Sequence, residues 1–213
     1  MKKIISVTLL VVLMLSAFAG CDAVEDILQK LPVPTNPTNP ADAARTTVTE
    51  EEWLAAMESD NYTVDVVSTN GEQSATENMK FTESSRYHHN QQNGFVNEAY
   101  YAKIDNTTYF IKKEGDGFVA REISNVEVGV KLGDVYSAID LREVYSSLVY
   151  DENTNSYKYS YADTQTFDFA FYFNNGIIQT VEMIVNASAT TVNFHIYDVG
   201  TTVVELPEYT MAS

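Results

Sequence analysis

The chain has 213 residues and a net charge of −17 at pH 7, with 30 acidic side chains against 13 basic ones. Such a chain lacks the clustered Lys and Arg that nucleic acid or an anionic lipid surface requires, which excludes both as electrostatic partners. The length suffices for one domain with its own core, and a single cysteine excludes an internal disulfide.

The first twenty residues have the three parts of a secretory signal. Lys2 and Lys3 are followed by an apolar stretch from Ile4 to about Leu15, and small residues come next. The stretch is too short for a comfortable membrane span and has no basic flank on its far side. We therefore expect residues 1–20 to be removed, which leaves a still more acidic chain.

The segment before Cys21 resembles a bacterial lipobox, in which small residues precede a cysteine that receives a diacylglycerol and becomes the new N-terminus. Ala19 and Gly20 match that pattern, whereas Phe18 stands where the family usually has Leu. The resemblance implies a lipid anchor on Cys21 and an exported protein of the bacterial cell envelope. The alternative is an ordinary signal peptide that leaves a free thiol, but an exported protein has little other reason to keep one here.

Residues 21–46 predict a lipidated N-terminus and a tether. Four prolines between Pro32 and Pro40 fix φ and remove hydrogen-bond donors, so this segment is a semi-stiff spacer. Its simplest role is to lift the folded domain off the membrane. A proline-rich recognition ligand is the alternative, but no basic residue stands beside the prolines.

Two capping boxes predict two short helices within a single antiparallel β domain of residues 47–209. The first box, Thr49–Glu52, begins a helix that we expect to end near Ser59 and to pack on a larger layer through Trp53. The second box, Asp140–Glu143, begins a helix between strands. The fold class is therefore α+β and mostly β, with one or two short helices packed on one face of the sheet.

Alternation of polar and apolar residues begins at Asn61 and predicts an antiparallel meander. The turn signals between its strands are Asn70-Gly71, Asn93-Gly94, Asp105-Asn106 and Glu114–Gly117. A later segment from Val149 to Tyr161 reads as a hairpin with an Asn-rich loop. A final strand is expected from Thr201 to Leu206, ending at Pro207.

The last third of the chain carries the strongest alternation. Three long strands present one apolar face, with Phe167, Phe169, Phe171 and Phe173 on the first, Val181, Met183 and Val185 on the second, and Val192, Phe194 and Ile196 on the third. A sheet of roughly eight to ten strands with such a face must curl, be covered by the two helices, or both.

The residues indicate no catalytic or metal chemistry. His88 and His89 are adjacent, so they point to opposite faces of a strand and cannot hold one metal together, and all three histidines are interpreted as surface residues. Asp151 opens a segment like a calcium loop, but Ser156 replaces its required Gly. We predict no enzyme, no metal and no cofactor. The 14 tyrosines are interpreted as lining sheet faces, with a carbohydrate platform left open.

The order of parts resembles the LolA and LppX/LprG-like lipoprotein-carrier fold over about residues 49–208. The likeness rests on the Thr-Glu-Glu-Glu-Trp helix start and on the ending from Phe194 to Pro207, which has an aromatic strand, an Asp-x-Gly turn and a short strand closing on Pro. The resemblance implies an unclosed, strongly curved antiparallel half-barrel, with helices over its concave face and a cavity that takes acyl chains.

Two function classes remain open. The first is a non-catalytic carrier or binding lipoprotein that holds a lipid or another apolar ligand between sheet and helices. The second is a surface structural or interaction lipoprotein whose apolar face is a packed core, with no small-molecule ligand. The residues expected to line a ligand are Trp53 from the helix and Phe169, Phe171, Met183, Val192 and Phe194 from the sheet.

Overall fold

The computed structural model describes residues 48–71, 73–92, 95–134, 139–163 and 165–212. The predicted signal segment, Cys21, the tether and the Asn93-Gly94 turn lie outside the described residues. Within the described part of the chain, no helix is both long and apolar enough to cross a membrane.

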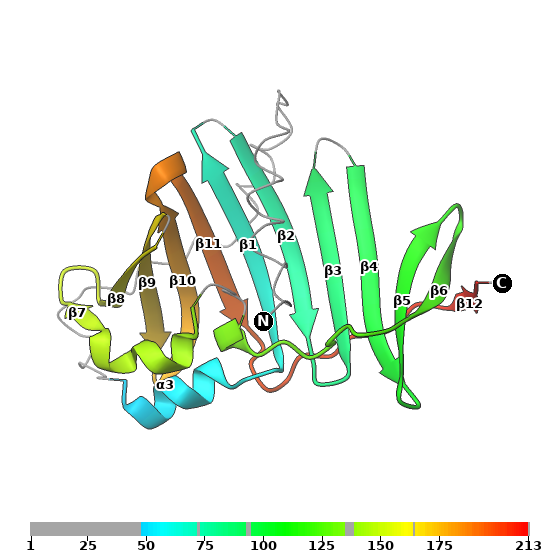
Figure 1. The fold of residues 1–213 in the computed structure, drawn as a ribbon, viewed down its shortest axis with the longest axis horizontal. Coiled ribbons are helices and arrows are strands. Elements are labelled where there is room, and N and C mark those ends of the chain that lie inside the picture. The colour runs from blue at the N-terminus through cyan, green and yellow to red at the C-terminus, as the bar shows by residue number, and fades with distance from the viewer. Residues whose placement is uncertain (1–47, 72, 93–94, 135–138, 164, 213) are drawn as a thin grey trace.

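In this described part, twelve strands form one sheet in the spatial order β12-β6-β5-β4-β3-β2-β1-β11-β10-β9-β8-β7 (Figure 1). Its strands are β1 Tyr62–Asn70, β2 Gln73–Phe81, β3 Ser85–Gln92, β4 Phe95–Ile104, β5 Thr107–Glu114, β6 Gly117–Ile123, β7 Val149–Asp151, β8 Ser156–Ala162, β9 Thr166–Asn174, β10 Ile177–Val185, β11 Thr190–Tyr197 and β12 Tyr209–Met211. Among the described residues, only the pairing of β12 with β6 is parallel. The edge strands β7 and β12 lie at opposite ends, so the sheet is unclosed and the predicted fold class is confirmed.

Two details of the predicted strands are wrong. The sheet has more strands than the expected eight to ten: its edges are the three-residue strands β7, which begins the predicted hairpin at Val149, and β12, which the sequence did not indicate. The final strand is not Thr201–Leu206 but Tyr209–Met211, beyond Pro207. Asp198 has a left-handed φ of 53°, so the chain leaves β11 in a turn and crosses the sheet before it pairs again.

The helical segments are α3 Glu50–Met57, η2 Leu132–Asp134, η3 Leu141–Ser147 and η4 Asn186–Ser188. The capping box at α3 is confirmed, because the Thr49 hydroxyl accepts from the Glu52 N–H at 3.2 Å and the Glu52 carboxylate accepts from the Thr49 N–H at 2.8 Å. The helix ends at Met57, two residues before the expected end.

The second predicted capping box is confirmed in its N-cap, Asp140, but not in the expected bond to Glu143. The Asp140 carboxylate accepts from the N–H of Arg142 rather than from that of Glu143. The same carboxylate also accepts from the Arg142 guanidinium at 2.7 and 3.1 Å, which draws it toward the start of the segment. The segment that follows is a 3-10 helix, η3, in place of an α-helix.

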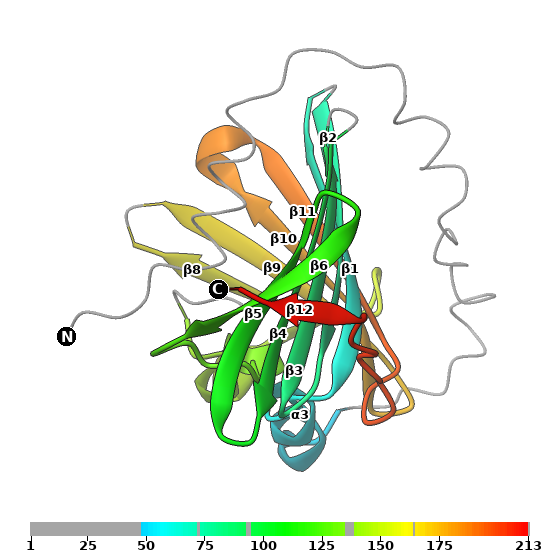
Figure 2. The ribbon, with the colours of Figure 1, turned by 90° about the vertical axis from the view of Figure 1, so that its right-hand side faces the viewer.

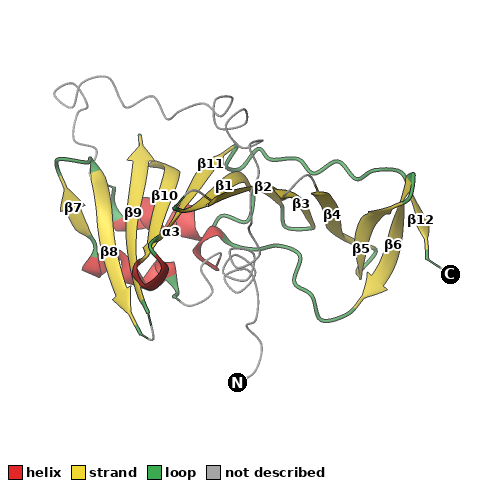
Figure 3. Cartoon of the chain, turned by 90° about the horizontal axis from the view of Figure 1, so that it is seen from above, coloured by secondary structure: helices red, strands yellow, loops and turns green. Residues whose placement is uncertain are grey.

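The sheet separates two layers (Figure 3). Both ends of the sheet bend toward the face that carries α3 and η3, so these helices lie on the concave face. The C-terminal segment from β11 to β12 crosses the opposite, convex face, and β12 lies alongside β6 (Figure 2). The main core lies between the helices and the sheet, and a smaller cluster around Tyr100 and Ile111 lies on the convex face, where Val204 and Leu206 pack against it.

Candidate functional site

Strand register places the predicted sheet residues in two adjacent rows on the concave face. The row closer to α3, called the near row, consists of Tyr157, Phe171, Val181 and Phe194, each opposite the next on neighbouring strands. The row beyond it, called the far row, consists of Tyr159, Phe169, Met183 and Val192. All five predicted sheet residues are therefore brought together, and the sequence reasoning missed Val181 and the two tyrosines.

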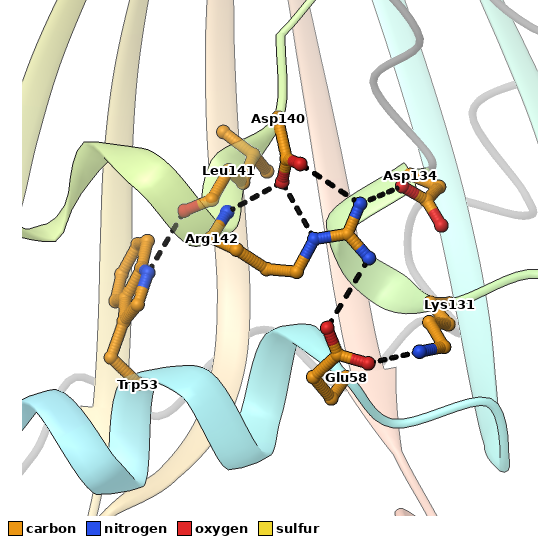
Figure 4. A network of polar contacts seen from close by, with 7 residues as sticks. All are labelled: Trp53, Glu58, Lys131, Asp134, Asp140, Leu141 and Arg142. Carbon is orange, nitrogen blue, oxygen red and sulfur yellow. Dashed lines mark hydrogen bonds and ion pairs between the residues drawn. The ribbon is translucent and has the colours of Figure 1, made fainter.

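Trp53 covers the near row from α3. Its ring meets Phe171 edge-on, with centroids 4.9 Å apart and an interplanar angle of 80°, and Phe173 lies 5.8 Å away. Its indole Nε1 donates to the main-chain oxygen of Leu141 at 2.9 Å, which ties α3 to η3 (Figure 4). Trp53, the sixth predicted residue, therefore contacts the predicted sheet residues from the helical layer.

Burial changes along the face. The six predicted residues are at most 5% exposed and belong to the main core. At the end of β8 and β9 away from α3, Tyr161 and Phe167 are half-buried, with ring centroids 6.4 Å apart. The apolar face therefore extends past the helical layer to aromatic rings that are half-buried.

A buried polar group continues the near row toward β3. Glu77 lies opposite Val66, and Asn90 lies opposite Glu77. The Glu77 carboxylate is 9% exposed; it accepts from the Asn90 amide at 3.0 Å and lies 3.2 Å from the Nε2 of His88. A buried carboxylate needs such partners to offset its desolvation. The sequence signal was present, since Glu77 shares the parity of the buried residues Met79 and Phe81.

The histidines follow the predicted parity but not the predicted exposure. His88 faces the concave side and His89 the convex side, as expected from adjacent strand positions. His88 is only 18% exposed and contacts Glu77, so its interpretation as a surface residue is wrong. His195 lies on the convex face opposite Asp65, and its Nδ1 is buried without a hydrogen-bond partner among the described residues. No three His, Cys, Asp or Glu side chains of the described part gather in a way that could hold a metal.

A group of charged side chains, called the polar clasp, holds the helical layer together (Figure 4). Its members are Glu58, Lys131, Asp134, Asp140 and Arg142. The Arg142 guanidinium contacts Asp140 at 2.7 Å, Asp134 at 2.5 Å and Glu58 at 3.4 Å, and Lys131 pairs with Glu58. The hydrogen bond from Lys131 lowers the pKa of Glu58, and that from Arg142 lowers the pKa of Asp140. The clasp thus joins the C-terminus of α3 to η2 and η3.

Two clefts lie away from the predicted ligand residues. One, of about 600 Å³, lies on the convex face between the sheet and residues 201–205. The other, of about 500 Å³, lies beside the clasp, between residues 126–131 and strands β4 and β5. None of the six predicted residues lines either cleft.

Comparisons with known proteins give a loose likeness in fold. No family model and no curated protein matches the chain. Among solved structures, MucB in complex with MucA(peri) is similar at 8% identity and a TM-score of 0.29, over 70% of this chain and 55% of that one. A DUF1329 family protein from Desulfovibrio piger ATCC 29098 is similar at 10% identity and a TM-score of 0.29, over 70% and 88%. This chain spans about half the length of the MucB chain, and the likeness says nothing about a ligand.

Proposed function

We propose that the protein is a non-catalytic extracytoplasmic lipoprotein, anchored through a lipid on Cys21, that binds a lipid or another apolar ligand between its sheet and its helices. The observation that carries the proposal is the pair of apolar rows on the concave face. The rows continue past the helical layer to the half-buried rings of Tyr161 and Phe167. A ligand that enters over these two rings, which lie opposite each other on β8 and β9, meets Phe169 two residues further along β9 on the same face.

The near row also supplies a polar end. It runs from Tyr157 on β8 to Val66 on β1 and meets the Glu77 carboxylate on β2. Five steps between strands, each of about 4.8 Å, span about 24 Å. An extended amphiphile with a long acyl chain has a similar length. Its chain lies across the strands, and its hydrogen-bonding head lies beside Glu77 and His88.

The anchor is tested by the substitution Cys21→Ser in the full chain. We expect loss of labelling by radioactive palmitate and release or mislocalisation of the protein, while circular dichroism shows an unchanged β domain. Cell fractionation that leaves the Cys21→Ser protein on the membrane overturns the anchor.

The ligand is tested separately from the anchor. The chain is exported behind an ordinary cleavable signal with Cys21→Ser and purified without detergent, and its organic extract is analysed by mass spectrometry. We expect a stoichiometric apolar molecule, and the pair Phe167→Asp and Tyr161→Asp should reduce it. The matched control is Val149→Asp, at an exposed position on the edge strand β7, which should retain it.

A second candidate is a surface structural or interaction lipoprotein without a small-molecule ligand. It is favoured by the low exposure of the six predicted residues and by the placement of both clefts elsewhere. A packed core has this appearance, because protein interiors leave few voids. Clean protein that also fails to take up an apolar probe supports this candidate over the carrier.

A further inference from the structure

The cleft on the convex face lies on the side of the sheet opposite the proposed apolar site. Its floor is one row across four strands, in which Thr63, Lys80, Tyr87 and Tyr100 each lie opposite the next. Asn78 lies beside this row, and residues 201–205 form the opposite wall. At about 600 Å³, the cleft has the volume of an ordinary small-molecule site.

The wall formed by the C-terminal segment is fixed by hydrogen bonds. The Thr202 N–H donates to Asn61 Oδ1 at 2.8 Å, and the Asn61 amide donates back to the Thr202 carbonyl at 3.2 Å. The hydroxyls of Thr63 and Thr202 lie 2.9 Å apart and are buried. The Gly200 N–H donates to the Asn61 carbonyl at 2.8 Å. The cleft is therefore preformed, which limits the entropy lost when a ligand binds.

Two aromatic rings give the floor its apolar part. The rings of Tyr87 and Tyr100 have centroids 5.0 Å apart and are inclined at 49°. The Tyr100 hydroxyl donates to Glu98 at 2.7 Å, which holds that ring in place. Tyr87 is half-buried, so part of its ring faces the cleft. The C–H groups on one face of a flat, partly apolar ligand can pack against an aromatic ring of this kind.

The charges in the cleft select against an ionic ligand. Lys80 has no ion pair within the described part of the chain, and its ammonium lies 6.0 Å from the Tyr87 ring. Asp198 and Glu205 line the same cleft. An anion attracted by Lys80 meets two carboxylates, and a cation attracted by the carboxylates meets Lys80. A neutral hydroxyl group both donates and accepts hydrogen bonds, so it can accept from the Lys80 ammonium and donate to the carboxylates.

We propose that this cleft binds a neutral saccharide of one to three rings, with one ring face on Tyr87 and hydroxyl groups on Asn78, Lys80 and Asp198. This site goes beyond the proposed apolar function and does not depend on it. The full chain therefore has two binding faces, an apolar concave face and a polar convex face with an aromatic floor.

The test uses the full chain in a mild detergent without a sugar head, with glucose and maltotriose as neutral probes and glucuronic acid and glucosamine as charged counterparts of glucose, followed by saturation-transfer NMR and calorimetry. We expect at least one neutral probe to bind and both charged sugars to bind at least tenfold more weakly. Tyr87→Ala should weaken binding at least tenfold, whereas Tyr87→Phe keeps the ring and most of the affinity.

Lys80→Gln removes the cation of the cleft and should weaken binding several-fold. The matched control is Lys113→Gln on β5, because Lys113 is exposed and does not line the cleft. Thermal unfolding checks that each variant is folded. The proposal is overturned if no neutral probe binds, if a charged sugar binds best, or if Tyr87→Ala retains wild-type affinity in a folded protein.

Discussion

The indole Nε1 of Trp53 donates a 2.9 Å hydrogen bond to the main-chain oxygen of Leu141, 88 residues further along the chain. The bond is buried, and it joins α3 to η3 directly above Phe171. One side chain therefore both fills the core and fixes the two helical segments to each other. This contact and the polar clasp together join α3, η2 and η3.

Removing this hydrogen bond should destabilise the domain more than the loss of buried apolar surface area alone would. Trp53→Phe leaves the buried Leu141 carbonyl without its donor, and we expect a loss of about 1–3 kcal/mol in the free energy of unfolding. Trp53→Ala also leaves a cavity and should lose about 3–5 kcal/mol. Urea unfolding followed by circular dichroism measures both. Leu54→Ala, on the exposed side of α3, is the control and should stay within about 0.5 kcal/mol; a Trp53→Phe variant as stable as the control contradicts the assignment.

Gly176 couples the β9–β10 turn to the start of α3. It has a left-handed φ of 76°, and a Cβ added to it meets Glu52 Oε1 at 2.7 Å, which disturbs the capping box. We expect Gly176→Ala to lose about 1–2 kcal/mol, more than the backbone effect alone. Gly115→Ala is the matched control, because its φ of 62° gives similar strain but its Cβ meets nothing within 4 Å. Equal losses in denaturant unfolding contradict the coupling.

The polar clasp should make stability depend on pH. Glu58 and Asp140 have pKa values below their ordinary 4.5 and 3.8, because Lys131 and Arg142 favour the charged carboxylates. A lowered folded pKa adds stability above the ordinary value, and this stability is lost as pH falls through the lowered one. The pH range in which the clasp loses its contribution to stability therefore begins below about pH 4.5 and extends to lower pH.

Arg142→Gln removes the central cation of the clasp. We expect it to flatten the loss of stability on acidification below pH 4.5 and to increase amide hydrogen exchange in α3 and η3 at neutral pH. Strands β3 to β5 should exchange as in the wild type. Lys113→Gln changes the net charge equally without touching the clasp, so an identical effect of both variants rules out a specific role for the clasp.

The buried Glu77 should contribute to stability through its contacts with Asn90 and His88. Glu77→Ala removes the acceptor of the Asn90 amide and the contact with the His88 imidazole, and we expect a loss of about 1–3 kcal/mol in the free energy of unfolding. Glu77→Gln keeps one acceptor oxygen and should lose less. Thermal and urea unfolding provide the comparison, with Glu83→Ala at an exposed position as control. A Glu77→Ala protein as stable as that control shows that the polar group is solvated.

The sequence predicted the parts of the fold that depend on local pattern. Alternation at Phe169 and Phe171 identified the concave face, and the capping box at Thr49 identified α3. In contrast, β12 pairs through three exposed residues whose partner lies about 90 residues earlier in the chain, so no local pattern marks it. Asp140 caps η3 as predicted, but its carboxylate accepts from the N–H and guanidinium of Arg142 and not from the N–H of Glu143, a choice that the spacing of the box does not reveal.

The candidate sites were predicted only in part for the same reason. Alternation tells which residues share a face, but register tells which of them are neighbours. The near row meets Glu77 only because β1 pairs with β2 in the observed register, and the convex cleft exists only because the C-terminal segment returns across β1 to β4. Neither relation is encoded within one strand.

The most direct test of the carrier account uses Trp53, the only tryptophan in the chain, as a reporter inside the proposed site. Its fluorescence is measured while the protein is titrated with a long-chain monoacylglycerol, whose head is neutral, and, separately, with the same lipid carrying two bromine atoms on its acyl chain. If an apolar ligand binds between sheet and helices, the brominated lipid quenches Trp53 saturably and the plain lipid competes with it. Equal emission with both lipids at saturating concentration contradicts the account and leaves the concave face as a packed core.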